Sequence, residues 1–286
     1  MYTAMSDIRL PFFFSPCPND TYMFDAMVHH KIDTEGLLFA PRLADIEALN
    51  HAAFREEAAI TKLSYHAYAH VADRYKILPS GSALGHGNGP LLVSRRFDGA
   101  VEPADAAIAI PGRYTTAALL LKIAFPQVAR LHEYLFSDIE KAVLCGRVDA
   151  GVLIHEGRFT YVAKGLHLIA DLGRQWEQRT QQAIPLGCIA VSRRLDEALQ
   201  QRVARVVRRS IDFAFRYPQE SAAFVKQHAQ ELNPSITAQH IALYVTGYSL
   251  DLGDDGRRAV AIFFEEALRA GAITKAPEEI FLACGE

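Results

Sequence analysis

Short apolar segments alternate along the chain with longer segments in which apolar residues recur every three or four positions. The short segments have the length of buried strands, and the longer ones have the period of amphipathic helices. The expected strands are IRLPFFF, GLLFAP, AAITKL, GPLLVSR, AAIAIP, LHEYLF, DAGVLI and GCIAVSR. The expected helices cover residues 22–29, 64–74, 116–124, 138–146, 196–217, 219–230, 237–247 and 255–271. This alternation predicts an α/β protein with mostly parallel sheets.

The order of these elements indicates two lobes. The helix 138–146, with Gly146 at its C-terminal end, leads into the buried strand DAGVLI, and the later strand IPLGCIAVSRR leads into the helical end of the chain. A chain that leaves one α/β lobe, builds a second and returns would give this order. We therefore expect residues 1–95 and 190–286 to form lobe one and residues 96–189 to form lobe two. The cleft between such lobes is a natural small-molecule site.

Composition excludes several classes of protein. Half of the 286 residues are apolar, 22% are charged and the net charge is −3, so a broad basic surface for nucleic acid is not expected. No apolar run reaches the ~18 residues that span a membrane. The start, MYTAMSDIRL, lacks the basic residues and apolar core of a signal peptide. The four cysteines are widely spaced without a C-x-x-C motif, which predicts reduced thiols and a cytoplasmic protein.

The stretch SPCPNDTYMF joins the first expected strand to the first expected helix. Two prolines stiffen it, and a polar residue is expected to cap the helix that starts near Tyr22: Asn19, Asp20 or Thr21. Free N–H groups at a helix start suit an anionic ligand. A nucleophilic Cys17 would need a nearby base and a lowered pKa, which the flanking prolines do not supply. A ligand-facing turn or an ordinary connection is therefore favoured over a catalytic cysteine.

Polar residues also follow other expected strands at their ends, where open α/β sheets bind ligands. Lys62 and Ser64 lie at the end of AAITKL. In PGRYTTA, Thr115 or Thr116 is expected to cap a helix. Arg113 in the same motif either pairs with a ligand carboxylate or is solvated.

His155 follows directly on the apolar strand DAGVLI. A neutral histidine held at the mouth of a cleft can accept a proton near pH 7. The adjacent Glu156 either raises the pKa of this histidine or faces solvent. A single histidine after a strand is more often structural than catalytic, so the residue pattern alone leaves both roles open.

Two weaker signals favour structural interpretations. His66 and His70 share a helix face, but no third metal ligand is evident, so we expect surface histidines rather than a metal site. The loop GSALGHGNGP contains neither the phosphate-loop nor the dinucleotide-binding order of glycines. It is expected to be a flexible turn or hinge.

Six segments taken in order resemble one enzyme family, the 1,4-dihydroxy-6-naphthoate synthases of the futalosine route to menaquinone. These segments are SPCPNDTYMF, TKLSYHAYA, GHGNGPLLV, PGRYTTA, IHEGRFTY and DLGRQWEQRTQQAIPLGCIAVSR, and the resemblance runs from about Leu10 to Val260. It implies a two-lobed fold like that of type II periplasmic binding proteins. It also implies a lyase that converts cyclic dehypoxanthinyl futalosine to 1,4-dihydroxy-6-naphthoate and dihydroxyacetone with neither metal nor organic cofactor.

The resemblance also implies roles for particular residues. The family's general base falls on His155. Its substrate contacts fall on Lys62, Leu63, Ser64, Thr116 and Ala117. The residue patterns add a further set of pocket candidates: Ser15, Asn19, Asp20, Arg113 and Thr115.

Several alternatives stay open. Chorismate dehydratase shares this fold and pathway, and a non-catalytic small-molecule binding protein would share the fold. The apolar helical end of the chain either docks a second copy, giving a homodimer, or packs on lobe one. Either Lys62 or Arg113 would hold the substrate carboxylate, and the sequence does not show what orients the ring of His155.

Overall fold

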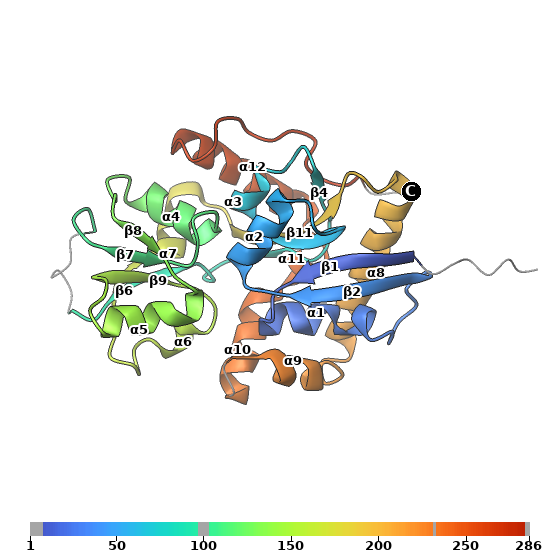
Figure 1. The fold of residues 1–286 in the computed structure, drawn as a ribbon, viewed down its shortest axis with the longest axis horizontal. Helices are drawn as coiled ribbons and strands as arrows, with labels where there is room; N and C mark the ends of the chain where they lie inside the picture. Colours follow the sequence, from blue (N-terminus) through green and yellow to red (C-terminus); the bar gives the residue numbers. More distant parts are fainter. Residues whose placement is uncertain (1–7, 97–102, 231–232, 284–286) are drawn as a thin grey trace, which may run out of the picture.

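The computed structural model describes residues 8–96, 103–230 and 233–283, which form two sheets covered by helices (Figure 1). The first sheet has the order β2-β1-β3-β11-β4, with β5 paired to β11. Its strands are β1 Ile8–Phe14, β2 Leu37–Leu43, β3 Ile60–Ser64, β4 Tyr75–Ile77, β5 Ala83–Gly85 and β11 Ile184–Ser192. The second sheet has the order β10-β6-β9-β7-β8. Its strands are β6 Leu91–Ser94, β7 Ile108–Ile110, β8 Leu131–Glu133, β9 Ala150–Leu153 and β10 His167–Asp171.

Most helices belong to lobe one, the part of the chain built around the first sheet (Figure 1). They are α1 Pro18–Val28, α2 Ile46–Phe54, α3 Tyr65–Tyr68, α8 Glu197–Arg216, α9 Ala222–His228, α10 Pro234–Tyr244, α11 Gly247–Leu250 and α12 Gly253–Arg269. Lobe two, around the second sheet, contains α4 Thr116–Ala124, the 3₁₀ turn η1 Phe136–Asp138, α5 Ile139–Leu144, α6 Gly157–Thr160 and α7 Leu172–Thr180. None of the described helices is both long enough and apolar enough to cross a membrane.

The sheets are mixed, so the expectation of mostly parallel sheets is wrong. β1 runs parallel to β2 and β3, and β7 runs parallel to β8 and β9. In contrast, β11 is antiparallel to β3, β4 and β5, and β6 is antiparallel to β9 and β10. β6 and β11 are the first strands after the chain crosses between lobes. Neither is joined to a neighbouring strand of its own sheet by the kind of helical crossover that parallel pairing requires, and each runs opposite to its neighbours.

Sheet membership differs from the expected lobe boundaries by a few residues. β6, within the expected span 1–95 of lobe one, pairs in the second sheet, while β11 begins at Ile184 and pairs in the first. The chain therefore crosses between β5 and β6 and again between β10 and β11. Hydrogen-bond partners decide sheet membership, and the sequence pattern does not reveal them.

The start of α1 also differs from the expectation. The helix begins at Pro18, with Cys17 as its N-cap, rather than near Tyr22. Proline suits the first helical turn because an N–H group there would have no partner within the helix, so no hydrogen bond is lost. Asn19, Asp20 and Thr21 therefore lie inside the helix. In α4 the expected cap is confirmed, because the Thr115 side chain accepts a hydrogen bond from the amide of Ala118.

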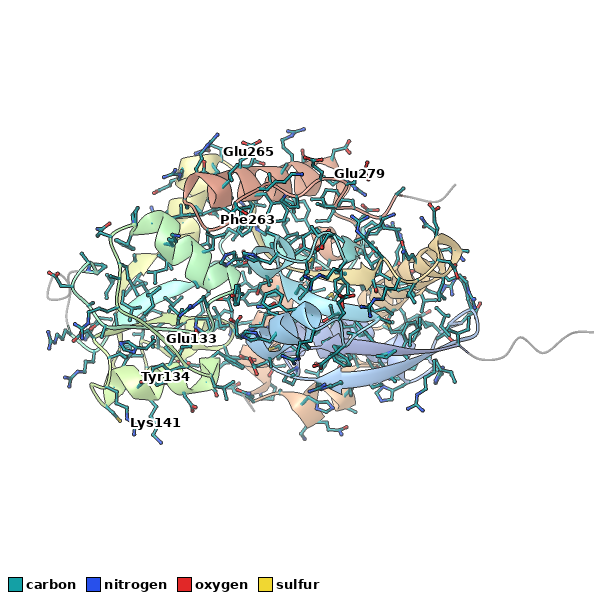
Figure 2. All side chains as sticks on the ribbon, turned by 45° about the horizontal axis from the view of Figure 1, so that its top comes forward. Glu133, Tyr134, Lys141, Phe263, Glu265 and Glu279 are labelled. Atoms are coloured by element: carbon teal, nitrogen blue, oxygen red, sulfur yellow. The ribbon has the colours of Figure 1, made fainter. Side chains whose placement is uncertain are left out.

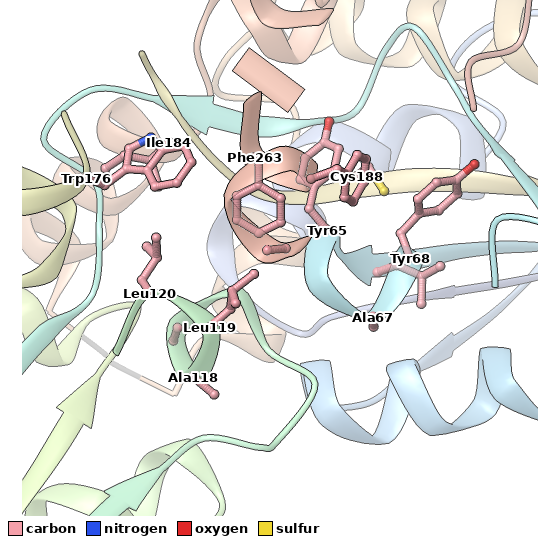
Figure 3. Packing of buried hydrophobic residues seen from close by; sticks show 14 of the residues in the cluster. Tyr65, Ala67, Tyr68, Ala118, Leu119, Leu120, Trp176, Ile184, Cys188 and Phe263 are labelled. Atoms are coloured by element: carbon pink, nitrogen blue, oxygen red, sulfur yellow. The ribbon is translucent and has the colours of Figure 1, made fainter. Parts of the chain in front are cut away.

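The largest apolar cluster among the described residues is shared by both lobes. Phe263 of α12 lies between Trp176 of α7 and Tyr65 of α3, with ring centroids 5.7 and 6.2 Å away (Figure 3). Leu119 of α4 belongs to the same cluster. Figure 2 shows Phe263 beneath α12, whereas Glu265 lies on its outer side. The helical end of the chain thus packs across both lobes of its own chain, and a homodimer stays a prediction.

Candidate active site

A cavity of about 80 Å³ lies between the lobes. Lobe one contributes the lining residues Ser15, Asn19, Ile46, Lys62, Ser64, Ala83 and Tyr244. Lobe two contributes Thr115, Thr116, Ala117, Ile154 and His155, and the segments next to the crossings contribute Asn88, Pro90, Leu186 and Gly187. Small-molecule sites commonly measure ~300–1,000 Å³, so a ligand of that size requires the lobes to separate.

A larger cavity, of about 670 Å³, lies between the end of α8, α9 and α10. Its lining is mainly apolar, and Lys226 is the charged residue among the described side chains that line it. It holds none of the sequence-predicted site residues. The smaller cavity is therefore the better candidate, because eight of them line it: Ser15, Asn19, Lys62, Ser64, Thr115, Thr116, Ala117 and His155.

A buried ion pair supports the lobe-one wall of the cavity. Lys62 Nζ lies 2.8 Å from Asp20 Oδ1, and both side chains are almost wholly buried. Asp20 Oδ2 accepts hydrogen bonds from the backbone amide and the hydroxyl of Ser15, at 3.1 and 2.8 Å. Asn19 Nδ2 donates to Asp20 Oδ1 at 2.8 Å. Asp20 thus lies behind the lining and fixes three residues that form it.

Successive side chains along β3 point to opposite faces of the sheet. Lys62 and Ser64 face the cavity, whereas the Leu63 side chain is buried in the apolar cluster on the other face. The backbone of Leu63 pairs with Cys188 of β11. Of the expected contacts on this strand, two therefore present side chains to the cavity and Leu63 does not.

The start of α4 forms part of the lobe-two wall. The amides of Thr116 and Ala117 lie in the first turn, where N–H groups have no partner within the helix. The Thr116 hydroxyl donates to the carbonyl of Leu186 at 2.8 Å, which ties α4 to β11. Arg113 is outside the lining: its side chain is mostly exposed, and its Nε lies 3.5 Å from Glu133 Oε1.

His155 follows β9 with a φ of 55°, a left-handed backbone conformation that is uncommon for residues other than glycine. Such conformations concentrate at functional sites because the surrounding structure must hold them in place. Burial lowers the pKa of His155 to about 4, although the Asp20 carboxylate opposes this shift. The imidazole is therefore neutral at pH 7, and a neutral imidazole can accept a proton.

Several side chains surround the ring of His155, including that of Tyr244, whose ring centroid is 6.4 Å away. The Phe136 ring meets it edge to face at 5.0 Å, and the His240 ring stacks on it at 5.7 Å with an interplanar angle of 16°. Cys17 Sγ lies 3.7 Å from His155 Nε2. Burial raises the pKa of Cys17 well above its usual value, so this group is a thiol rather than a nucleophilic thiolate at neutral pH. Cys17 is therefore a neutral contact of the imidazole rather than a nucleophile.

His240 of α10 connects the lobes behind the cavity. Its Nε2 lies 3.1 Å from Asn19 Oδ1, which fits donation to that amide oxygen. Its Nδ1 lies 3.6 Å from Glu156 Oε1 of lobe two. The ring is fully buried, and burial lowers the pKa of His240 well below its usual value. No sequence signal marked this residue or its neighbour Tyr244, because both lie in an ordinary helical pattern.

The two histidines expected on the surface behave differently. His70 is exposed, but His66 is buried, and both rings pack near Tyr114 of lobe two at 5.4 and 6.3 Å. Burial lowers the pKa of His66 to about 4. Within residues 8–96, 103–230 and 233–283, no three histidine, cysteine or acidic side chains gather into a group that could hold a metal ion.

Comparisons with known proteins show the family and the fold of this chain. The sequence profile of a family described as menaquinone biosynthesis matches residues 14–269. The chain is 44% identical to a 1,4-dihydroxy-6-naphthoate synthase of Thermus thermophilus, over 97% of this chain and 100% of the relative. It is 39% identical to the enzyme of the same name from Streptomyces coelicolor, over 94% and 96%.

Solved structures show the same architecture. A protein from Archaeoglobus fulgidus has a TM-score of 0.88 at 36% identity, covering 93% of this chain and 98% of that one. The alkanesulfonate-binding protein of Xanthomonas axonopodis has a TM-score of 0.70 at 14% identity, covering 98% of both chains. The second likeness shows the fold alone, and it confirms the expected two-lobed periplasmic-binding-protein-like fold.

Proposed function

Because the chain belongs to the menaquinone biosynthesis family, with relatives that are enzymes of that pathway, we propose that it is a lyase acting on cyclic dehypoxanthinyl futalosine. The products are 1,4-dihydroxy-6-naphthoate and dihydroxyacetone. The observation that carries this proposal is His155, which lines the cavity between the lobes and is kept neutral by burial. The names of the relatives support the dihydroxynaphthoate product, and the position of His155 supports the chemistry.

In the proposed reaction, His155 removes a proton from a sugar hydroxyl of the substrate. The resulting alkoxide becomes a carbonyl as the adjacent carbon–carbon bond breaks, and the electron pair of that bond passes to the ring system. The ring then becomes aromatic and recovers a proton from the imidazolium, which returns the base to its starting state. General-base catalysis of this kind typically contributes ~10²–10⁴-fold in rate.

The cavity walls supply groups for substrate binding. Lys62 is the only Lys or Arg among the described residues that line the cavity, so we assign the substrate carboxylate to it rather than to Arg113. The hydroxyl of Ser64 and the first-turn amides of α4 complete a polar surface for the same end of the substrate. Closure of the lobes would bring this surface and His155 together and would exclude water.

The test is a mass-spectrometric turnover assay on the purified protein. Cyclic dehypoxanthinyl futalosine is supplied with a chelator and without added metal, and the dihydroxynaphthoate product is measured. Product formation would support the proposal. With folded protein and intact substrate, failure to form product would refute it. Turnover of chorismate would then indicate the dehydratase, and tight binding without turnover would indicate a binding protein.

A further inference from the structure

Asn88 is a buried polar residue that the mechanism above does not use. It lies in the segment between β5 and β6, and it lines the same cavity as His155. Its relative exposure is 1%, and neither Nδ2 nor Oδ1 has a hydrogen-bond partner among the described residues. Buried carboxamides nearly always have hydrogen-bond partners, because losing water without replacement is unfavourable. An unpartnered carboxamide in a cavity wall therefore points to a ligand.

The loop that carries Asn88 is fixed, in contrast to the expected flexible turn or hinge. Its Gly87 amide donates to Glu177 Oε1 at 2.6 Å, and Arg158 donates to the carbonyl of Gly89. Gly89 packs so closely on Gly173 that a Cβ at position 89 would lie 2.3 Å from the Cα of Gly173. The loop is thus anchored to α6 and α7 of lobe two.

The carboxamide of Asn88 packs against the backbone of Gly85, which carries no side chain. A Cβ at Gly85 would lie 2.9 Å from Asn88 Nδ2, so the glycine leaves the space that the side chain occupies. Its position is therefore set by the loop before any ligand arrives. Preorganised polar groups of this kind contribute to specificity because their alternative is to remain unpaired.

We propose that Asn88 binds two adjacent hydroxyl groups of the substrate, donating through Nδ2 to one and accepting through Oδ1 from the other. A carboxylate would satisfy only Nδ2, and an aromatic ring would satisfy neither atom, whereas neighbouring hydroxyls satisfy both. This inference rests on the proposed function, in which a hydroxyl-bearing, sugar-derived part of the substrate reacts at His155. Asn88 then selects that part of the substrate and orients it toward the base.

The kinetic test combines a variant with a modified substrate. Asn88→Leu keeps the approximate size of the side chain but removes its hydrogen bonds. The analogue lacks one hydroxyl next to the one that reacts. We expect Asn88→Leu to lower kcat/KM about 10- to 100-fold with the full substrate. The wild type should lose a similar factor with the analogue, and the variant should lose little more. His86→Ala, an exposed change in the same loop, is the control and should leave kcat/KM unchanged.

Two kinetic results would overturn the inference while leaving the proposed function intact. One is wild-type kcat/KM in Asn88→Leu. The other is a variant that loses as much as the wild type when the hydroxyl is removed, because independent losses mean that Asn88 and that hydroxyl do not interact.

A second measurement decides the inference if the wild type does not turn over the proposed substrate. The side-chain ¹⁵N–¹H signals of Asn88 are identified by their loss in Asn88→Leu. Methyl ribofuranoside, an uncharged compound with adjacent hydroxyls, is then titrated into the protein. A saturable shift that methyl 2-deoxyribofuranoside does not produce would support the diol site although the proposed reaction had failed. No shift would overturn the inference as well.

Discussion

The buried pair of Asp20 and Lys62 allows a quantitative test of how the cavity wall is held. In Asp20→Ala, the carboxylate that Lys62 Nζ contacts at 2.8 Å is lost, as are the hydrogen bonds from Ser15 and Asn19. The lysine side chain is only 6% exposed, so its charge would remain buried without a partner. Breaking a buried pair from one side typically costs ~3–5 kcal/mol. We expect a loss of this size in the free energy of unfolding.

The measurement is urea unfolding at pH 7, followed by circular dichroism, with a double-mutant cycle. Lys62→Met alone should also be costly, because it leaves the Asp20 carboxylate buried. The cycle compares Asp20→Asn, Lys62→Met and the two substitutions combined. In the combined variant both charges are gone, and its loss should be smaller than the sum of the losses in Asp20→Asn and in Lys62→Met by about 2 kcal/mol or more.

The exposed pair of Asp212 and Arg216, whose side chains are 38% and 68% exposed, provides the control. Asp212→Asn should cost less than about 1 kcal/mol, because exposed ion pairs are weakened by water and salt. Our reasoning would be refuted if Asp20→Ala cost no more than this control. Additive losses in the cycle would refute it as well, because they would show that Asp20 and Lys62 are not coupled.

Three further predictions concern other parts of the molecule. His155→Asn should retain the fold by circular dichroism and lower kcat by ~10²–10⁴-fold, and near-normal turnover would contradict the role of this residue as the base. His66 and His155 have pKa values of about 4 in the folded protein, against ~6.5 in the unfolded chain, so the unfolded chain binds more protons between these values. The free energy of unfolding should therefore rise with pH from about 4 to 6.5, by at most ~3 kcal/mol for each group. Urea unfolding at several pH values would measure this rise. A free energy of unfolding that does not change over this pH range would contradict the prediction. Gly112→Ala should cost about 1–3 kcal/mol, because φ is 139° and a Cβ would lie 2.4 Å from the Glu47 side chain. Thermal unfolding would measure this loss. In the same experiment Gly247→Ala, where a Cβ meets nothing within 4 Å, should unfold at nearly the temperature of the wild type.

Local signals predicted several elements well. The bounds of α4 agree with the expected 116–124, because a threonine cap and a preceding Pro-Gly mark its start. The start of α8 is marked by the Asp196 cap. In contrast, β4 and β5 have only three residues each, too few to show a period, and α2 and β10 were also missed. Pro16 and Pro18 are typical of a loop, so the start of α1 was expected too late in the chain, although proline also fits a first helical turn.

Part of the site could be predicted from the rule that polar residues at strand ends line ligand sites. That rule found Lys62, Ser64 and His155, because each lies where a strand reaches the cavity. It could not find His240, which is 221 positions from its partner Asn19 and is brought there by the packing of α10. The rule also cannot tell which way a strand-end side chain points, as the exposed position of Arg113 shows.

The apolar cluster around Phe263 has a consequence for how the protein gains and loses its structure. Because α3, α4, α7 and α12 all contribute to it, neither lobe keeps a complete core when the other is removed. We therefore expect one cooperative transition on heating rather than a separate transition for each lobe. We also expect the cleft to open without breaking this cluster, so that the substrate enters while the interior stays intact.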